Sequence, residues 1–114
     1  MRTLDQINLK PAERQAVSDA ARVLRKQFPV QQVILFGSKA RGDDDPESDA
    51  DLLVPTSRPV TRPMRQQMRE AVLPIEMSSD VWMGLTVVWT RDWEHGVYRV
   101  LPIRHEIDRD GVAA

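Results

Sequence analysis

A glycine-serine turn and a pair of carboxylates, separated by ten residues, could together bind a phosphate and a metal ion. Gly37-Ser38 ends a continuous apolar run, 33–36, of the kind that forms a buried strand. Small residues at a strand end let the backbone come close to a bound group. Backbone amides after Gly37 and the Ser38 hydroxyl are therefore candidate phosphate ligands. Asp49 and Asp51 open the next short apolar run.

The two aspartates are expected to face the same way, because side chains two positions apart on a strand share a face. Two like charges on one face repel each other unless a cation lies between them. Mg²⁺ is commonly held by one or two carboxylates together with substrate phosphates. Asp49 and Asp51 are thus candidate metal ligands, although a solvated strand edge is the alternative interpretation. Arg41 could balance phosphate charge or pair with the acidic segment 43–47.

This order of motifs resembles the signature of the DNA polymerase beta-like nucleotidyltransferase superfamily. The resemblance is carried by Gly37-Ser38-Lys39-Ala40-Arg41-Gly42 and by Ser48-Asp49-Ala50-Asp51-Leu52-Leu53-Val54. The segment 40–42 and the small size of the chain point further, to the minimal nucleotidyltransferase (MNT) group. Many MNT proteins are encoded beside a helical HEPN-domain protein and act as its antitoxin, some of them by transferring AMP to it.

The resemblance implies a site for ATP or another nucleoside triphosphate together with Mg²⁺. It assigns the catalytic metal ligands to Asp49 and Asp51, and nucleotide binding to Gly37, Ser38 and Arg41. The expected partner is a HEPN-domain protein, and a homo-oligomer is a further expectation. The implied function is that of an antitoxin that binds Mg-ATP and transfers AMP to its partner.

Two other functions stay open at this point. The protein could be a catalytically degenerate interaction module that neutralises a HEPN ribonuclease by binding alone. It could also be a nucleotidyltransferase acting on an antibiotic, which is less favoured because a chain of this length leaves no room for an acceptor-binding domain.

A third carboxylate decides whether the site is catalytic. In the superfamily, an acid on a later strand completes a two-metal centre. The matching strand here is 85–89, and Thr86 stands at the position of that acid. Threonine has no charge to offset a second cation. Glu76, Asp80 and Asp92 are the acids that could substitute, although none lies on the expected strand, so the sequence leaves enzymatic activity open.

Length and composition limit the kinds of protein that could carry these motifs. The 114 residues are expected to form one nucleotidyltransferase-like domain, 1–114. The net charge of −1 gives no general attraction to nucleic acid or to an anionic membrane. The sequence lacks cysteine, which excludes disulfides and thiolate chemistry. The first residues contain charges and no long apolar stretch, so we expect a cytoplasmic protein without direct nucleic-acid or membrane binding.

Apolar periodicity and proline positions predict the elements that hold the site. The expected order is helix, strand, turn, strand, helix, strand, helix and a last helical turn, at residues 11–28, 30–36, 38–41, 49–54, 61–73, 85–89, 91–101 and 103–110. Thr61 and Thr90 are expected to cap helices, and Pro55 and Pro74 to end elements. Several α/β or α+β layouts fit this order. The resemblance selects the α+β nucleotidyltransferase fold, with helices packed on one side of a small mixed sheet.

One helix also carries a row of positive charges. Arginines recur at three- and four-residue steps opposite its apolar face, at Arg58, Arg62, Arg65 and Arg69. Such a row is expected to be a solvated face, with a docking surface for an acidic partner or RNA as the alternative.

Overall fold

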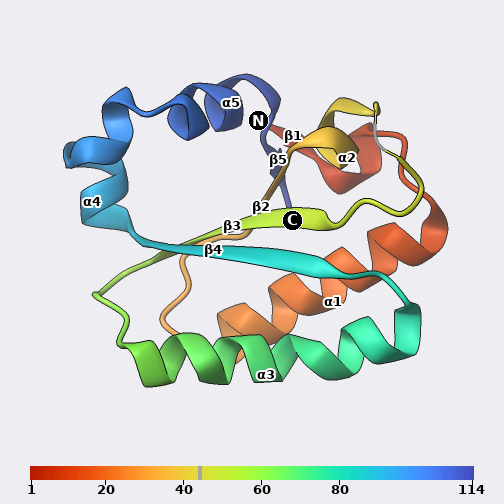
Figure 1. Cartoon of the computed structure of the whole chain (residues 1–114), viewed down its shortest axis with the longest axis horizontal. Coiled ribbons are helices and arrows are strands. Elements are labelled where there is room, and N and C mark those ends of the chain that lie inside the picture. The colour runs from red at the N-terminus through yellow and green to blue at the C-terminus, as the bar shows by residue number, and fades with distance from the viewer. Residues whose placement is uncertain (44) are drawn as a thin grey trace.

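The computed structural model describes residues 1–43 and 45–114, and over these ranges the chain forms a five-stranded mixed sheet with helices on both faces (Figure 1). The strand order is β1-β5-β2-β3-β4. The strands are β1 (Arg2–Thr3), β2 (Ile34–Phe36), β3 (Ala50–Thr56), β4 (Met83–Trp89) and β5 (Val112–Ala113). The helices are α1 (Pro11–Gln27), α2 (Ser38–Arg41), α3 (Arg62–Ser79), α4 (Thr90–His95) and α5 (Pro102–Asp110), with short 3₁₀ turns η1 (Leu4–Gln6) and η2 (Val97–Val100).

Strand β3 is buried on both faces, and this explains why helices cover both sides of the sheet. Leu52 and Val54 pack toward the cluster that α1 and α3 supply. Leu53 points the other way and packs with Trp93 of α4 and Ile107 of α5. The expected α+β fold is confirmed, but the expectation that all helices lie on one side was wrong. A strand that is apolar at consecutive positions, as β3 is, needs cover on both faces.

Several elements begin and end close to their predicted positions. Helix α1 starts at Pro11 and buries Val17 and Leu24, and α2 has the bounds that the sequence predicts. Gly42 ends α2 in the left-handed conformation, with φ 82°. Strands β1 and β5 were not predicted, because two-residue strands leave no periodic pattern to detect.

Three strand boundaries differ from the sequence prediction by two residues or more, and one of them is the start of β4, which lies at Met83 and not at 85. The strand expected over 30–36 pairs only from Ile34, because Val30 makes an isolated bridge to Thr56. Strand β3 does not stop at Pro55 but continues to Thr56. The carbonyl of Pro55 accepts from the Gln31 amide, on the side where β2 is no longer paired. The missing proline N–H therefore removes no bond from the β3–β4 ladder.

Helix α3 does not end before Pro74 but continues to Ser79. Pro74 lies on the exposed side, so its ring does not disturb the core. A contact across the proline position holds the two halves together: Arg69 Nη2 donates to both carboxylate oxygens of Glu76, at 2.5 and 2.7 Å. Glu76 Oε2 also accepts from the Met83 amide at 2.9 Å, which ties α3 to the start of β4.

The arginine row is not a free solvated face. Strand β4 lies at the edge of the sheet, and its outward carbonyls need partners. Arg65 donates to the Val87 carbonyl and Arg69 to the Met83 carbonyl, both at 3.0 Å. Two of the four arginines therefore cap the sheet edge, while Thr61 caps α3 as expected.

The helix predicted over 91–101 is two elements, because Gly96 ends α4 in an extended conformation and η2 follows. The prediction that Thr90 caps this helix was also wrong. Its hydroxyl contacts Gln31 Oε1 at 2.5 Å and makes no capping bond. None of the helices in the described part of the chain is long and apolar enough to cross a membrane.

Replacing Glu76 should destabilise the fold strongly. Its side chain is fully buried, and Glu76→Ala would leave the Met83 amide and Arg69 without their acceptor. We expect a loss of about 3 kcal/mol in the free energy of unfolding, measured by urea denaturation. Glu70→Ala removes an exposed glutamate from the same helix and should change stability by less than about 0.5 kcal/mol. Equal effects of the two changes would contradict the anchoring role.

Candidate functional site

The carboxylate of Asp51 lies in a niche between two glycines. Its neighbours in the sheet are Phe36 on β2 and Gly84 on β4. A Cβ atom at Gly37 would stand 2.6 Å from Asp51 Oδ2, and one at Gly84 would stand 3.4 Å from Oδ1. Gly37 also has φ 78° and ψ −158°, a backbone conformation that only glycine adopts readily. The glycine of the Gly-Ser turn therefore makes room for the Asp51 side chain.

Negative charge accumulates around this niche. Burial raises the pKa of the Asp51 carboxyl above its ordinary value, and the nearby charges of Asp49 and Glu106 raise this pKa further. Arg41 acts in the opposite direction and lowers it. A second cation beside Asp51 would relieve the remaining repulsion. Two carboxylates form a hard-oxygen donor set of the kind that Mg²⁺ prefers, so Asp49 and Asp51 fit such an ion.

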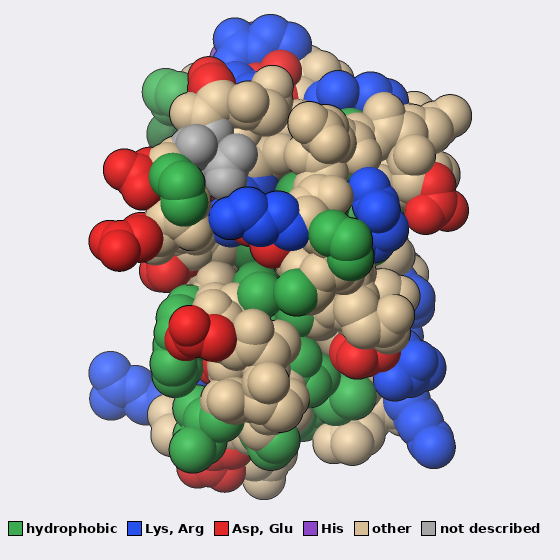
Figure 2. Space-filling model, turned by 90° about the vertical axis from the view of Figure 1, so that its right-hand side faces the viewer, with side chains coloured by type: hydrophobic (Ala, Val, Ile, Leu, Met, Phe, Trp, Pro, Cys, Tyr) green, Lys and Arg blue, Asp and Glu red, His purple; other side chains and the backbone are tan. Residues whose placement is uncertain are grey.

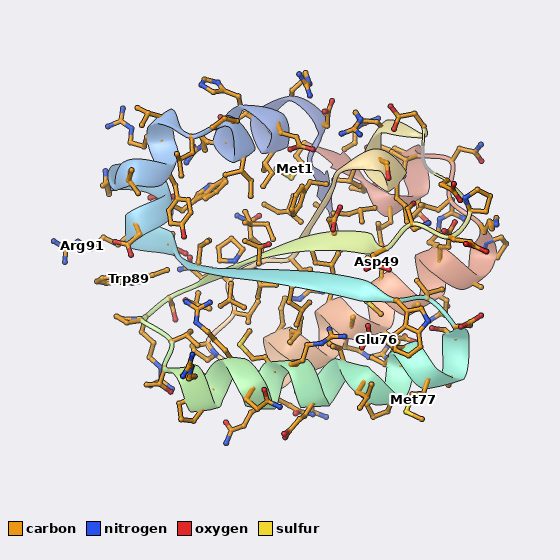
Figure 3. All side chains as sticks on the ribbon, in the orientation of Figure 1. Met1, Asp49, Glu76, Met77, Trp89 and Arg91 are labelled. Atoms are coloured by element: carbon orange, nitrogen blue, oxygen red, sulfur yellow. The ribbon has the colours of Figure 1, made fainter. Side chains whose placement is uncertain are left out.

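The Gly-Ser turn reaches the segment that precedes Asp49. Ser38 is the first residue of α2, and its hydroxyl oxygen lies 3.4 Å from that of Ser48. Figure 3 shows Asp49 at the end of the sheet where β3 begins. The structure thus brings Ser38 and the aspartate pair to one end of the sheet, as the sequence predicts.

Arg41 pairs with two acids. Its Nε donates to Asp43 at 3.2 Å and its Nη1 donates to Glu106 at 3.1 Å. Glu106, on α5, is a site residue that the sequence analysis did not identify. No local pattern near position 106 marks it, because α5 reaches this face of the sheet through long-range packing such as that of Ile107 with Ile34.

The four positions considered for a third acid do not complete a metal centre. Thr86 pairs with Leu53, two positions beyond the Asp51–Gly84 pair, and so lies on the same face of the sheet as Asp51. Glu76 is buried against Arg69, and Asp80 accepts from the Trp82 indole. Asp92 lies in α4, which follows the far end of β4.

Among the residues that the structure describes, no group of three His, Cys, Asp or Glu side chains could hold a metal ion. The described site therefore offers a carboxylate pair, with Thr86 in place of a third acid on the same sheet face.

A pocket of about 470 Å³ opens beside Asp49. Lys39 and Glu13 form one wall, where they make an ion pair with 2.5 Å between Nζ and Oε2. Asp80, Trp82, Ser48 and Asp49 also line the pocket. Figure 2 shows this end of the molecule, where several acidic side chains lie along the left edge of the view and basic side chains lie mainly nearer its centre and right.

Because the pKa of Asp51 is raised, removing the charge of this side chain should stabilise the folded protein, and the size of this effect should depend on pH. Because its pKa is raised in the folded state, the native protein binds this proton more readily than the unfolded chain does. The Asp51 carboxylate thus lowers stability as pH rises through the interval between the unfolded and folded pKa values. We expect Asp51→Asn to raise the melting temperature at neutral pH in EDTA, and this gain to shrink as pH falls below that interval. A variant that is less stable than the wild type at neutral pH would contradict the charge repulsion.

The sequence profile of the nucleotidyltransferase domain family matches residues 17–98, which include the Gly-Ser turn, the aspartate pair and Thr86. The chain therefore belongs to the nucleotidyltransferase domain family. A search of curated proteins finds none that matches this chain.

Solved structures confirm the fold and its resemblance to MNT proteins. A toxin-antitoxin structure with AMP-PNP is 18% identical, with a TM-score of 0.55, over 81% of this chain and 66% of that chain. The structure of a tri-AMPylated HEPN toxin with an MNT antitoxin from Shewanella oneidensis is 15% identical, with a TM-score of 0.55, over 89% of this chain and 70% of that chain. A structure presented as that of a minimal nucleotidyltransferase is 22% identical, with a TM-score of 0.57, over 96% of this chain and 94% of that chain. This chain thus spans about two thirds of the length of the two toxin-antitoxin chains and nearly all of the third.

Proposed function

We propose that this protein is an MNT-type antitoxin that binds Mg-ATP and transfers AMP to a HEPN-domain partner. The observation that carries the proposal is the niche of Asp51, where Gly37 and Gly84 leave space around a carboxylate that shares its site with Asp49. The family match and the likeness to MNT–HEPN structures support the same proposal. The role as an antitoxin extends beyond the domain itself and rests on those relatives.

We assign each site residue a part in nucleotide binding. Asp49 and Asp51 would hold Mg²⁺, which when bound neutralises phosphate charge and polarises the reacting phosphoryl group. The Ser38 hydroxyl and the amides that follow Gly37 would donate to the triphosphate. Arg41 would exchange its contacts with Asp43 and Glu106 for a phosphate, which would leave Glu106 free to face the site.

The proposed transfer forms a bond between an acceptor hydroxyl oxygen and the α-phosphorus of ATP. The bond from this phosphorus to the β-phosphate bridging oxygen breaks, and pyrophosphate leaves. The hydroxyl loses its proton to a carboxylate of the site or to solvent. AMP remains on the acceptor, which is the kind of modification that the AMPylated HEPN toxin among the structural relatives carries.

A specific observation favours a second candidate, an antitoxin that neutralises a HEPN ribonuclease by binding alone. In the described part of the chain no group of three His, Cys, Asp or Glu side chains could hold a metal ion, and Thr86 occupies the same face of the sheet as Asp51. Losing the activating metal costs several kcal/mol of transition-state stabilisation, or on the order of a thousandfold in rate. A binding antitoxin needs no such centre.

The test uses the purified chain with the product of the neighbouring gene, which this proposal expects to be a HEPN-domain protein. Sedimentation of the mixture first asks whether the two proteins form a complex. ATP labelled at the α-phosphate is then added with Mg²⁺, and label on the partner is measured. Complex formation with labelling supports the transfer function, and a complex without labelling supports the binding antitoxin. A strict monomer that ignores the neighbouring protein would refute both.

A further inference from the structure

Trp82 presents an exposed indole beside the metal-binding end of the sheet. Its side chain is 45% exposed, and its Nε1 donates to Asp80 Oδ1 at 3.2 Å. Its backbone carbonyl accepts from the amide of Ala50, the residue between the two site aspartates, at 2.8 Å. The ring is therefore attached to β3 through the main chain and oriented by a neighbouring carboxylate.

The pocket that Trp82 lines shares Asp49 with the proposed nucleotide site. Its volume of about 470 Å³ is in the range of small-molecule sites, about 300–1,000 Å³. Asp49 and Ser48 line it at one end, and the Ser48 hydroxyl lies 3.4 Å from that of Ser38. A nucleotide whose phosphates contact Ser38 and the aspartates can thus extend its nucleoside toward Trp82.

The charges of the pocket favour a neutral group with hydrogen-bond donors. Lys39 is buried, with 3% of the residue exposed, and its ammonium group is paired with Glu13. This ion pair therefore contributes little net charge to the pocket. The remaining charged lining is mainly acidic, with Glu47, Asp49 and Asp80 against Lys10. Such a lining repels a further phosphate. A carboxylate only accepts hydrogen bonds, so Asp80 suits a ligand that offers N–H groups.

We propose that this pocket is the nucleobase subsite of the nucleotide site, in which the base stacks on Trp82 and donates an exocyclic amino group to Asp80. Aromatic side chains bind any base by stacking, while the carboxylate discriminates among bases. Adenine, cytosine and guanine carry an exocyclic amino group, and uracil does not. The inference rests on the proposed function, because it requires the triphosphate to bind at Ser38 and the aspartates.

Calorimetric titration of the full chain in Mg²⁺, with ATP and inorganic tripolyphosphate as ligands, tests the stacking. We expect Trp82→Ala to weaken ATP binding by roughly tenfold and to leave tripolyphosphate binding unchanged. Trp82→Phe keeps a stacking surface and should retain most of the affinity. An equal loss for both ligands, or no loss for ATP, would overturn the subsite.

Asp80→Asn tests the discrimination with ATP and UTP. Asp80 has φ 57°, a left-handed conformation that asparagine tolerates, so the change should not disturb the end of α3. The wild type should bind ATP roughly tenfold more tightly than UTP. This ratio should fall toward one in the variant, whose amide both donates and accepts. An unchanged ratio would contradict the role of Asp80.

The same titrations test the base subsite separately from the proposed nucleotide binding on which it rests. If the wild-type chain binds tripolyphosphate as tightly as ATP, the base subsite is wrong and the phosphate site stands. If it binds neither ligand, the proposed nucleotide site is wrong and the subsite fails with it.

Discussion

Gly37→Ala is expected to cost both stability and nucleotide binding. The new Cβ would stand 2.6 Å from Asp51 Oδ2, so the carboxylate or the turn would have to move. The backbone at Gly37 also lies in a region that is strained by about 1–3 kcal/mol for other residues. Misplacing a metal ligand in this way should weaken Mg-ATP binding by roughly tenfold or more. Urea denaturation and calorimetry on the same variant measure the two effects.

Gly42→Ala is the control for the backbone effect. Gly42 has φ 82°, and a Cβ there would meet nothing within 4 Å. This variant should lose about 1–2 kcal/mol of stability through its left-handed conformation and keep its affinity for Mg-ATP. If both variants bind Mg-ATP as the wild type does, contact between Gly37 and Asp51 is irrelevant to the site.

Thr86→Asp is expected to raise AMP transfer. The side chain at position 86 lies on the same sheet face as Asp51, and an added carboxylate there would help to hold a second cation. The gain from a restored activating metal is several kcal/mol, or on the order of a thousandfold in rate, if the rest of the centre is intact. Transfer of α-labelled AMP to the co-purified HEPN partner measures it.

Thr86→Asn controls for shape, because it adds a polar side chain without charge. It should leave transfer at the wild-type level. Robust labelling by the wild type at saturating ATP that is lost in Asp80→Ala or Asp92→Ala would show that another acid completes the centre. Absence of labelling in both the wild type and Thr86→Asp would favour the antitoxin that acts by binding alone.

The sequence predicted those helices and strands whose formation depends on residues close to one another in the chain. The four-residue helix α2 follows from the glycines at each end, and α1 follows from its apolar spacing. These predictions succeeded because steric and periodic constraints between near neighbours decide the outcome.

Contacts between distant segments explain the failures. Pro74 was expected to end a helix, but the Arg69–Glu76 pair and the bond to Met83 stabilise the turns beyond it. Pro55 was expected to end a strand, but its missing donor faces a side without a ladder partner. The residues adjacent to each proline do not reveal the contacts that allow the helix or the strand to continue.

The sequence predicted the motif residues of the site, but it did not predict the residues that surround them. The Gly-Ser turn and the aspartate pair come together because consecutive strands β2 and β3 are adjacent. Glu106 reaches the site from an element more than fifty residues away from Asp51, through packing that no local pattern encodes. The strand predicted over 85–89 leaves out Gly84, whereas this residue lies within β4 and forms one side of the Asp51 niche.

The central claim is that Asp49 and Asp51 hold the metal of a nucleotide site, and calorimetric titration with ATP and Mg²⁺ tests it most directly. The double change Asp49→Ala, Asp51→Ala should weaken binding by on the order of a hundredfold, because loss of even an outer-shell partner costs a metal site about 10- to 100-fold. The double change Asp5→Ala, Glu70→Ala removes the same charge from exposed positions outside the proposed site and should bind as the wild type does. Mg²⁺-dependent binding that only the site variant loses is the predicted result. Equal affinity in the wild type and the Asp49→Ala, Asp51→Ala variant would contradict the claim.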